Sequence, residues 1–486
     1  MGTKLCQMAR AAGFMPVAAA VVLVLAGCSG LIPGSRPIQL PELPRQADTL
    51  PGAQREHQRI LTVYGGAYND PKLEALISRT VDRLVAASER PDLTYRVTLL
   101  NSPAINAFAL PGGQLYVTRG LIALANDTSE LASVLSHEMS HVIARHAAIR
   151  EDQARQAAIV SRVVTDVLSD PETGALALAK SKIALASFSR SQEFEADALG
   201  VGLAARAGYD PYGAVRFLRA MGRNAELKAR SKPTPQLPDF LSSHPATPER
   251  VLNAQTSARR YLAPGAGERE HETYVASLDG LVYGEDPSEG FVRGRRFLHP
   301  KLGFTFTAPE GFSLDNTAQA VLGAKDGGSQ ALRLDIVRIP ADQSLTDYLL
   351  SGWIENVDRG SIDEHPINGL ASATATAQSD DWAFRLYVVR FGGDIYRFIF
   401  AAKHRTPATD LAFRYAIGTF RRMTLSEIDR AKPLRLRIVT VRPGDTVEKL
   451  AARMMIDRPL ERLRVLNGID VGDRVKAGNQ IKIVVE

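Results

Sequence analysis

The spacing of apolar residues changes character near residue 290, and this change constrains the fold more than any other feature. From about Gln54 to about residue 260, apolar residues recur at helical spacing, as in DPKLEALISRTVDRLVAA. From about Gly290, apolar and polar residues alternate at the strand period in segments such as ALRLDIVRIP, WAFRLYVVRF and DIYRFIFAAK. A chain of 486 residues also exceeds the size of one ordinary core. We therefore expect a multidomain α+β protein.

The N-terminus has the layout of an export signal over residues 1–28. Lys4 and Arg10 precede about fourteen uncharged residues, which is the length of a signal-peptide core and shorter than the roughly twenty that span a bilayer. The run ends in LAGC, which resembles a bacterial lipobox, so we expect a lipid on Cys28 that anchors the chain to a membrane. Residues 29–53 are rich in proline and predict an extended tether.

These features predict a lipoprotein of the bacterial cell envelope that faces the periplasm, and Ser29 fits sorting to the outer membrane. Cys6 is the only other cysteine and lies within the signal, so we expect no structural disulfide in the mature chain. The net charge of +6 is spread out, with no run of five or six basic residues, so we expect no nucleic-acid partner.

The segment SVLSHEMSHVIARH, residues 133–146, carries the strongest chemical signal. Its apolar residues predict a helix on which His137 and His141 lie one turn apart on one side. That separation lets two imidazoles reach one zinc ion, with Glu138 beside them to act on a water. His146 follows five residues after His141 and would point about 140–180° away on a continuous helix, so we expect a solvent-facing or helix-terminal residue.

A third metal ligand has to come from another segment, and SRSQEFEADALG offers carboxylates on a predicted helix. Glu193 and Asp197 are four residues apart and share a face, whereas Glu195 points nearly opposite. One carboxylate of the first pair could bind the metal while the other orients a ligating imidazole. Spacing favours this pair over Glu195 but also fits an ordinary charged helix surface.

Four segments, in order and spacing, resemble the HtpX/CAAX-protease-like zinc metallopeptidases, especially the BepA-like periplasmic lipoproteins: INAFALPGGQLYVTRGLI, SELASVLSHEMSHVIARH, SRSQEFEADALGVGLAARAGYDP and SSHPATPER. The resemblance implies a mainly helical, zincin-type (gluzincin) domain over residues 54–262 with one Zn²⁺ per chain. It implies His137, His141 and Glu193 as zinc ligands, Glu138 as the general base, and Asp197 as a residue that supports a ligand. It thereby decides between Glu193 and Glu195.

The same resemblance singles out His244, because relatives have a histidine near the zinc in this context. His244 would either stabilise the oxyanion or occupy the fourth zinc position and keep the enzyme latent. The chain differs from BepA-like relatives after the protease domain, where it has no 34-residue helical repeats. Their partners therefore do not carry over.

The substrate implied by the resemblance is an extended or unfolded polypeptide. INAFAL resembles an edge strand along which such a segment pairs through its backbone, followed by a turn at residues 111–113. Asn106, Ala107 and Phe108 are the expected substrate-binding residues, although an interior strand without a substrate role is the alternative.

The rest of the chain predicts a linker over residues 263–288 and a second domain over residues 289–430. In that domain, strands in short succession and two helices, over residues 344–357 and 408–423, favour an α/β sandwich with an antiparallel sheet. It resembles the PsbP/Mog1-like sandwich and has no catalytic constellation, so we expect a support or interaction domain. An alanine-rich run over residues 154–188, interrupted by charges, predicts a helical hairpin.

Residues 434–486 predict a separate unit in the order strand, helix, helix, strand, with Asp445 and Glu448 placed as a capping box. VRPGDTVEKLA, LERLRVLNGI and VKAGNQIKIV resemble a LysM module. The resemblance implies binding of peptidoglycan glycan in a groove lined by Gly444, Asp445, Thr446 and Asn467. The alternative is a LysM fold used only for packing.

Together these features predict a zinc endopeptidase of the cell envelope that cleaves unfolded or misassembled proteins for quality control. The alternative of another class is a wall-binding scaffold or chaperone-like lipoprotein with a low-turnover or structural zinc. Glu138 argues against that alternative, since a structural zinc requires no general base. A third hypothesis, suggested by the LysM module alone, is cleavage of peptidoglycan peptides.

Overall fold

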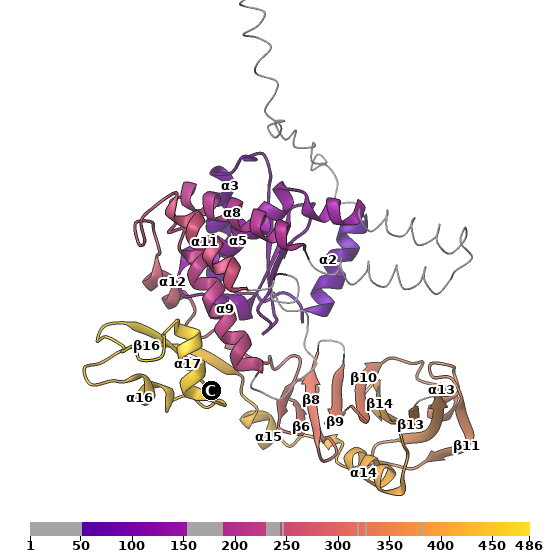
Figure 1. The fold of residues 1–486 in the computed structure, drawn as a ribbon. Coiled ribbons are helices and arrows are strands. Elements are labelled where there is room, and N and C mark those ends of the chain that lie inside the picture. Colours follow the sequence, from indigo (N-terminus) through magenta and orange to yellow (C-terminus); the bar gives the residue numbers. More distant parts are fainter. Residues whose placement is uncertain are drawn as a thin grey trace, which may run out of the picture. The chain divides into compact units, whose positions relative to one another are not determined.

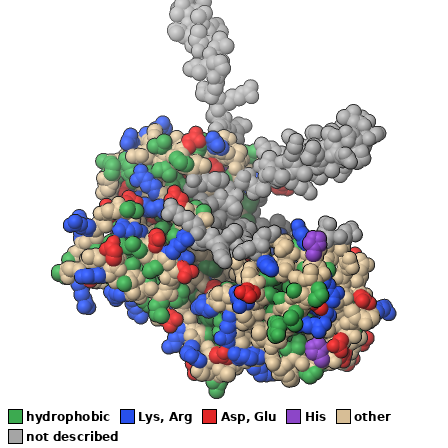
Figure 2. Space-filling view, turned by 60° about the horizontal axis from the view of Figure 1, so that its bottom comes forward, with side chains coloured by type: hydrophobic (Ala, Val, Ile, Leu, Met, Phe, Trp, Pro, Cys, Tyr) green, Lys and Arg blue, Asp and Glu red, His purple; other side chains and the backbone are tan. Residues whose placement is uncertain are grey.

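The structure, a computed structural model, describes residues 51–152, 188–229, 244, 247–317, 320–325, 328–379 and 382–486. The predicted signal peptide with Cys28, most of the tether and the alanine-rich hairpin lie outside these residues, so those statements stay predictions. Within the described part of the chain, no helix has both the length and the apolar character that a membrane crossing requires. On the face seen in Figure 2, basic and acidic side chains are interspersed.

Helices and one small sheet form the first part of the fold (Figure 1). Among the described strands, the sheet has the order β1-β3-β2, with β1 parallel and β2 antiparallel to β3, so β2 lies at an edge of this part of the sheet, as predicted. The elements are α2 (Pro51–Val63), α3 (Pro71–Ala86), β1 (Arg96–Leu100), β2 (Ala107–Ala109), β3 (Gln114–Thr118), α4 (Arg119–Leu124), α5 (Thr128–Ile143), α8 (Arg190–Arg206), α9 (Gly213–Ala229) and α11 (Pro248–Arg259).

Side-chain caps fix where the two central helices begin. The carboxylate of Asp127 accepts from the backbone N–H of Glu130 at the start of α5. Ser189 and Gln192 form a capping box at the start of α8. Helix α5 is buried along almost its whole length and packs against α3, α8, α9 and β2. The segment HEMSH, residues 137–141, which has the HExxH pattern, therefore lies on a buried, central helix.

The second part is β-rich, and its antiparallel sheet was predicted correctly. Seven strands pair in the order β11-β12-β13-β14-β10-β9-β8, and four in the order β15-β7-β6-β5. The elements are β5 (Phe291–Arg293), β6 (Arg296–His299), β7 (Phe304–Thr307), β8 (Phe312–Asn316), β9 (Val321–Lys325), β10 (Gln330–Val337), α13 (Leu345–Leu349), β11 (Val357–Glu364), β12 (Ser372–Ser379), β13 (Trp382–Phe391), β14 (Asp394–Ala402), α14 (Pro407–Gly418), β15 (Arg421–Arg422) and α15 (Leu425–Arg430).

The helix predicted over residues 344–357 is much shorter, because α13 ends at Leu349. Gly352 follows with φ +87°, a left-handed conformation that glycine favours and that a continuing helix excludes. The indole of Trp353 then folds back and donates to the carbonyl of Tyr348 at 2.9 Å. Helix α14 likewise ends before Arg421, which pairs as part of strand β15.

The segment predicted as a linker, residues 263–288, instead contains helix α12 (His271–Ser277) and strand β4 (Val282–Tyr283). Tyr274 and Leu278 in this segment are completely buried. Strand β4 pairs with β16 (Leu434–Thr440), which pairs in turn with β17 (Gln480–Val485), so the segment contributes the third strand of the C-terminal sheet, in the order β17-β16-β4. Its apolar residues explain why this segment packs into the core instead of forming an exposed linker between two domains.

The C-terminal residues have the predicted order of strand, helix, helix and strand: β16, α16 (Val447–Ala451), α17 (Pro459–Asn467) and β17 (Gln480–Val485). The predicted capping box is wrong, because Thr446 caps α16 and Asp445 accepts instead from the backbone N–H of Arg442. These residues are not a separate unit either, since they share one buried core with the helical part. The ammonium of Lys482 donates to the carbonyls of Ala123 and Ala125, each at 2.8 Å.

Candidate metal centre

The centre is built where α5 and α8 cross closely. A Cβ atom on Gly200 of α8 would lie only 3.0 Å from the backbone nitrogen of His137 on α5, so glycine permits this approach. The crossing brings the carboxylates near the start of α8 to the imidazoles of α5. His137, His141, Glu193 and His244 all lie buried, with one donor atom each within 4.8 Å of the others.

The distances between these donor atoms define the cluster. Nε2 of His137 lies 3.1 Å from Nε2 of His141 and 3.3 Å from Nδ1 of His244. Oε1 of Glu193 lies 2.8 Å from Nδ1 of His244 and 3.5 Å from Nε2 of His141. The structure thus brings together the three residues predicted as ligands and His244.

This donor set fits a zinc ion. Zinc prefers four ligands in a tetrahedron, and bonds of about 2.0–2.1 Å place the ligand atoms about 3.3 Å apart. The four separations given above, 2.8–3.5 Å, scatter around that value, and all the donor atoms lie within 4.8 Å of one another. Three imidazoles and one carboxylate are also ligand types that zinc accepts. Without a cation, four buried polar groups of this kind are costly to hold so close together.

Glu138 faces this cluster without belonging to it. It is 2% exposed, and its Oε1 has no hydrogen-bond partner among the described residues. That oxygen lies 3.7 Å from Nε2 of His244. Burial raises the pKa of the Glu138 carboxyl above its ordinary value, which is the direction that favours a general base.

Asp197 and Arg250 support the cluster from behind. Oδ1 of Asp197 lies 3.0 Å from Nδ1 of His137, which directs the other ring nitrogen to the metal position. Arg250 holds Asp197 with two hydrogen bonds of 2.7 Å and also contacts Oε2 of Glu193 at 2.7 Å. Asp197 was expected in this region, but Arg250 was assigned no role. The only signal for it was its position at the end of the SSHPATPER segment.

His146 is buried, so its prediction as solvent-facing is wrong, although it does follow the helix end. Arg145 has φ 56°, a left-handed conformation that turns the chain back after α5. Nδ1 of His146 consequently lies 2.9 Å from Nδ1 of His141, and its Nε2 lies 3.3 Å from Oε2 of Glu195. The prediction failed because it assumed a continuous helix. Glu195, which we do not expect to bind the metal, therefore contacts His146, and His146 contacts the metal-site residue His141.

The charges in the cluster match what a metal requires. Burial lowers the pKa of His141 to about 3, so its imidazole is neutral. Burial acts to raise the pKa of Glu193, but hydrogen bonds with His141 and His244 hold it well below its ordinary value. Burial acts to lower the pKa of His137, but the hydrogen bond with Asp197 and the charge of that carboxylate raise it overall, so a metal competes with a proton there.

The expected substrate-binding residues lie on or beside edge strand β2. The amide of Asn106 is buried and donates to the hydroxyl of Tyr64 at 2.9 Å, and the side chain of Ala107 is also buried. Phe108 is half-buried and stacks on Tyr116. The backbone edge of β2, rather than these side chains, is therefore what a substrate could meet.

The expected glycan-binding residues mainly hold their own module together. Asn467 bonds through its amide to the carbonyls of Leu463 and Lys482 and to the backbone N–H of Lys482. Asp445 and Thr446 fix the start of α16, as described above, and Gly444 has φ +84° in the same turn.

Two segments of the chain are similar to known protein families. Residues 71–258 match Peptidase family M48, and residues 439–484 match the LysM domain. The metal cluster on α5 and α8 lies inside the first match. The chain thus contains a segment similar to Peptidase family M48, followed by a segment similar to the LysM domain.

Individual relatives share the first of these domains. The putative beta-barrel assembly-enhancing protease of Vibrio cholerae is 32% identical over 276 residues, which cover 52% of this chain and 55% of the relative. The beta-barrel assembly-enhancing protease of Escherichia coli K12 is 30% identical over 222 residues, 44% of each chain. The mitochondrial metalloendopeptidase OMA1 of Schizosaccharomyces pombe is 30% identical and is covered to 65%. This chain spans about half the length of the first of these curated relatives.

Among solved structures, cyanobacterial PsbP from Synechocystis sp. PCC 6803 is similar at 16% identity, with a TM-score of 0.23. The likeness covers 29% of this chain and 98% of that one. It carries no information about function.

Proposed function

We propose that this protein is a zinc-dependent endopeptidase of the bacterial cell envelope that cleaves unfolded or misassembled proteins. The observation that carries the proposal is Glu138, a buried carboxylate with a raised pKa that faces three imidazoles and Glu193. A zinc site that serves folding alone requires no such group. The M48 match and the names of the protease relatives support the same conclusion.

In this proposal His137, His141 and Glu193 hold zinc in the gluzincin manner. Zinc, when bound, supplies a Lewis acid that activates water and polarises the scissile carbonyl. Glu138 takes the proton of the attacking water and returns it to the leaving amine. Asp197 and His146 fix the ring orientations of His137 and His141, and Arg250 holds Asp197 in place.

His244 decides whether the site is open. Its Nδ1 lies 3.3 Å from Nε2 of His137 and 2.8 Å from Oε1 of Glu193, separations that fit two ligands of one metal ion. These distances favour His244 as a fourth metal ligand over His244 as a stabiliser of the oxyanion. A histidine there would leave no room for the water that Glu138 has to activate, and these contacts of His244 therefore support the proposal that the enzyme is latent in this conformation. Activity then requires withdrawal of His244 from the cluster.

The proposed substrate is an extended polypeptide that pairs with the backbone of β2. An edge strand offers unpaired backbone groups to such a segment and selects little for sequence. Strand β2 packs against α5, which carries His137 and His141, and this supports a substrate path along β2 near the metal position. Loose selectivity of this kind suits the removal of unfolded proteins.

We also propose where in the cell envelope the protein is held. A lipid on Cys28 and the tether would hold the protein to the outer membrane on its periplasmic side, and the LysM domain would bind peptidoglycan. The domain over residues 289–430, proposed to be PsbP/Mog1-like, would serve support or interaction.

One experiment tests the enzyme against a scaffold with a structural zinc. The chain lacking residues 1–28 is incubated with an unfolded protein, with and without a chelator, beside Glu138→Gln and His244→Ala. Cleavage that the chelator and Glu138→Gln abolish supports the endopeptidase. Zinc binding without cleavage in any variant, His244→Ala included, favours the scaffold. If the protein instead releases peptides from peptidoglycan and does not cleave unfolded protein, the result favours an enzyme that cleaves peptidoglycan peptides.

A further inference from the structure

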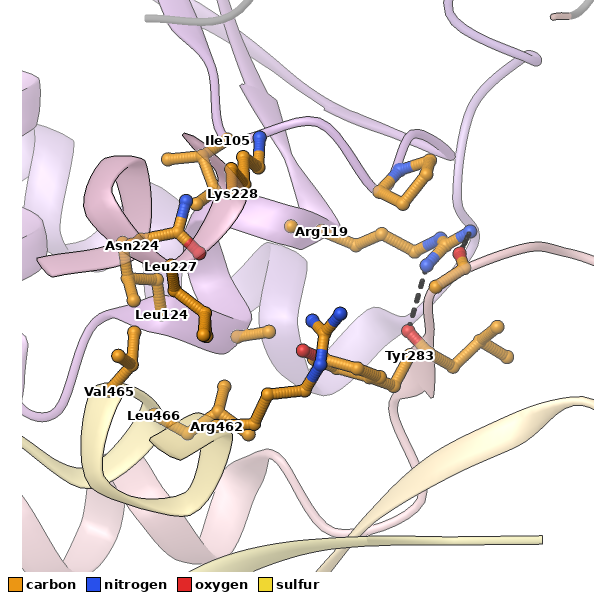
Figure 3. Close-up of a pocket in the computed structure, with 15 residues that line it drawn as sticks. Ile105, Arg119, Leu124, Asn224, Leu227, Lys228, Tyr283, Arg462, Val465 and Leu466 are labelled. Atoms are coloured by element: carbon orange, nitrogen blue, oxygen red, sulfur yellow. Dashed lines mark hydrogen bonds between the residues drawn. The ribbon is translucent and has the colours of Figure 1, made fainter. Parts of the chain in front are cut away.

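A cavity of about 210 Å³ lies where α4, the end of α9, strand β4 and helix α17 meet (Figure 3). It is separate from the metal centre, since none of the metal-site residues lines it. Its walls come from Pro103 and Ile105 ahead of β2, from α4 and α9, from residues 282–284, and from α17 of the LysM domain. An engineered cavity of about 150 Å³ accepts benzene, so this space is large enough for one apolar side chain and a small polar group.

The lining combines apolar walls with positive charge. Its apolar side chains include Ile105, Leu124, Leu227, Val465 and Leu466. Its charged side chains are Arg119, Lys228 and Arg462, and no Asp or Glu is among the described residues that line it. The cavity is therefore suited to an anionic group attached to an apolar one.

The burial of the Arg119 side chain points most directly to a ligand. Arg119 is 1% exposed, and its guanidinium donates to three uncharged oxygens: Oδ1 of Asn101 and the carbonyls of Val282 and Gly284, at 2.6–2.9 Å. It forms no ion pair with any residue that the structure describes, although Asp286 acts on it from a longer distance. Burial lowers the pKa of Arg119 to about 10. A buried cation is normally paired with an anion, so this one has the chemistry of a receptor.

A second guanidinium, that of Arg462, lines the cavity from α17. Figure 3 shows Arg119 and Arg462 reaching the cavity from different elements, α4 and α17. Nε of Arg462 donates to the carbonyl of Asp457 at 2.9 Å, which orients the planar group. Guanidinium groups bind carboxylates through two parallel hydrogen bonds, so the Arg462 guanidinium has the geometry to hold one.

The position of the cavity indicates where the carboxylate comes from. Ile105 lines it and lies two residues, or about 7 Å of extended chain, before β2 starts at Ala107, so the cavity adjoins the N-terminal end of this strand. A chain that pairs antiparallel to β2 runs with its C-terminal end toward Ile105. Its terminal carboxylate and last side chain then arrive at the two arginines and the apolar wall.

We infer that this cavity binds the free C-terminal carboxylate and the last apolar side chain of a polypeptide substrate. The inference rests on the proposed function, because it assigns the ligand to the substrate of that enzyme. The protein would then prefer polypeptides whose C-terminus is unfolded and apolar, and would hold them in one register along β2.

The test is a binding measurement with Glu138→Gln, so that cleavage does not interfere. The probe is a short, unstructured peptide that ends in leucine, labelled at its N-terminus, as the free acid and as the C-terminal amide. We expect the free acid to bind at least about tenfold more tightly. Arg462→Gln should reduce this preference to less than about threefold, because Arg462 is only partly buried and can be changed without disrupting the core. Arg453→Gln removes the same charge from an exposed position of the same domain and should leave the preference unchanged.

Three results would overturn the inference: equal binding of acid and amide, a preference that Arg462→Gln leaves intact, or a fatty acid that displaces the peptide as well as the unlabelled peptide does. The last result would identify a lipid as the ligand. Failure of the proposed function is distinguishable, because it is a loss of cleavage in the unmodified chain and in His244→Ala. A chain that cleaves unfolded protein but ignores the C-terminal carboxylate refutes this inference alone.

Discussion

The Nδ1 atoms of His141 and His146 lie 2.9 Å apart, on either side of the turn that ends helix α5. One of the two nitrogens has to donate and the other accept, and the contact of His146 with Glu195 favours His146 as the acceptor. His141 then carries its proton on Nδ1 and presents Nε2 to the metal position. His146, which is not part of the metal cluster, thus sets the tautomer of His141, which is.

This relationship predicts that His146→Leu weakens zinc binding about 10–100-fold, the usual cost of losing a residue that orients a ligand. His146→Asn should restore most of the affinity, because its amide oxygen can accept the same proton. Competition with a chromophoric chelator measures both. Equal affinities in His146→Leu and the unmodified chain would show that His141 is oriented by other contacts.

Arg250 predicts a large loss of stability when it is removed. It is 3% exposed and bonds to both Asp197 and Glu193, so Arg250→Gln leaves two buried carboxylates without their cation. Breaking a buried pair of this kind costs about 3–5 kcal/mol. The matched control is Arg190→Gln, which removes an exposed pair with Glu249 and should cost less than about 0.5 kcal/mol. Urea unfolding compares the two, and similar small losses would contradict the role of Arg250.

Lys482 links the LysM domain to the helices that carry the metal centre. Lys482→Met would leave the buried carbonyls of Ala123 and Ala125 without a donor, which costs about 1–3 kcal/mol. Lys476→Met, at an exposed position, should change the free energy of unfolding by less than about 0.5 kcal/mol. Because the two domains share a core, they should unfold in one transition. Separate transitions in calorimetry would contradict this coupling.

His299 predicts how the second domain responds to acid. Burial, followed by the charge of Lys301, lowers its pKa from 6.5 to about 4, and its Nδ1 accepts from the backbone N–H of Leu302. Its contribution to stability is therefore present above pH 6.5 and is lost as the pH falls toward 4, by about 2 kcal/mol at pH 4.5.

His299→Asn keeps an acceptor in that place and does not titrate. Thermal unfolding at pH 7 and pH 4.5 should therefore show a smaller drop in the variant than in the unmodified chain. Equal drops would mean that His299 is not responsible for the acid sensitivity.

The sequence predicted those parts of the centre that regular structure determines. His137 and His141 are neighbours on any helix, and Glu193 and Asp197 share a face on any helix, so the pairs follow from spacing. Whether α5 meets α8 depends on packing, including the space left by Gly200, and the family resemblance rather than spacing joined the two pairs.

Other features depended on single backbone conformations or distant partners. The left-handed Arg145 returns His146 to the site, and nothing in its residue type predicts that conformation. Arg250 acquires its role only once α11 packs against α8. Residues 263–288 looked like a linker because they are polar near residue 264, whereas their later apolar residues find a partner strand about 150 residues further on, in β16.

The most direct test of the central claim is the rate at which the chain lacking residues 1–28 cleaves an unfolded protein, compared with Glu138→Gln at equal zinc content. Loss of a general base typically slows a reaction about 10²–10⁴-fold, so cleavage in the variant should fall by that factor while zinc stays bound. The comparison is made in the His244→Ala background as well, so that a latent site is opened. Cleavage that persists in Glu138→Gln, or that a chelator does not suppress, would contradict a zinc peptidase at this site.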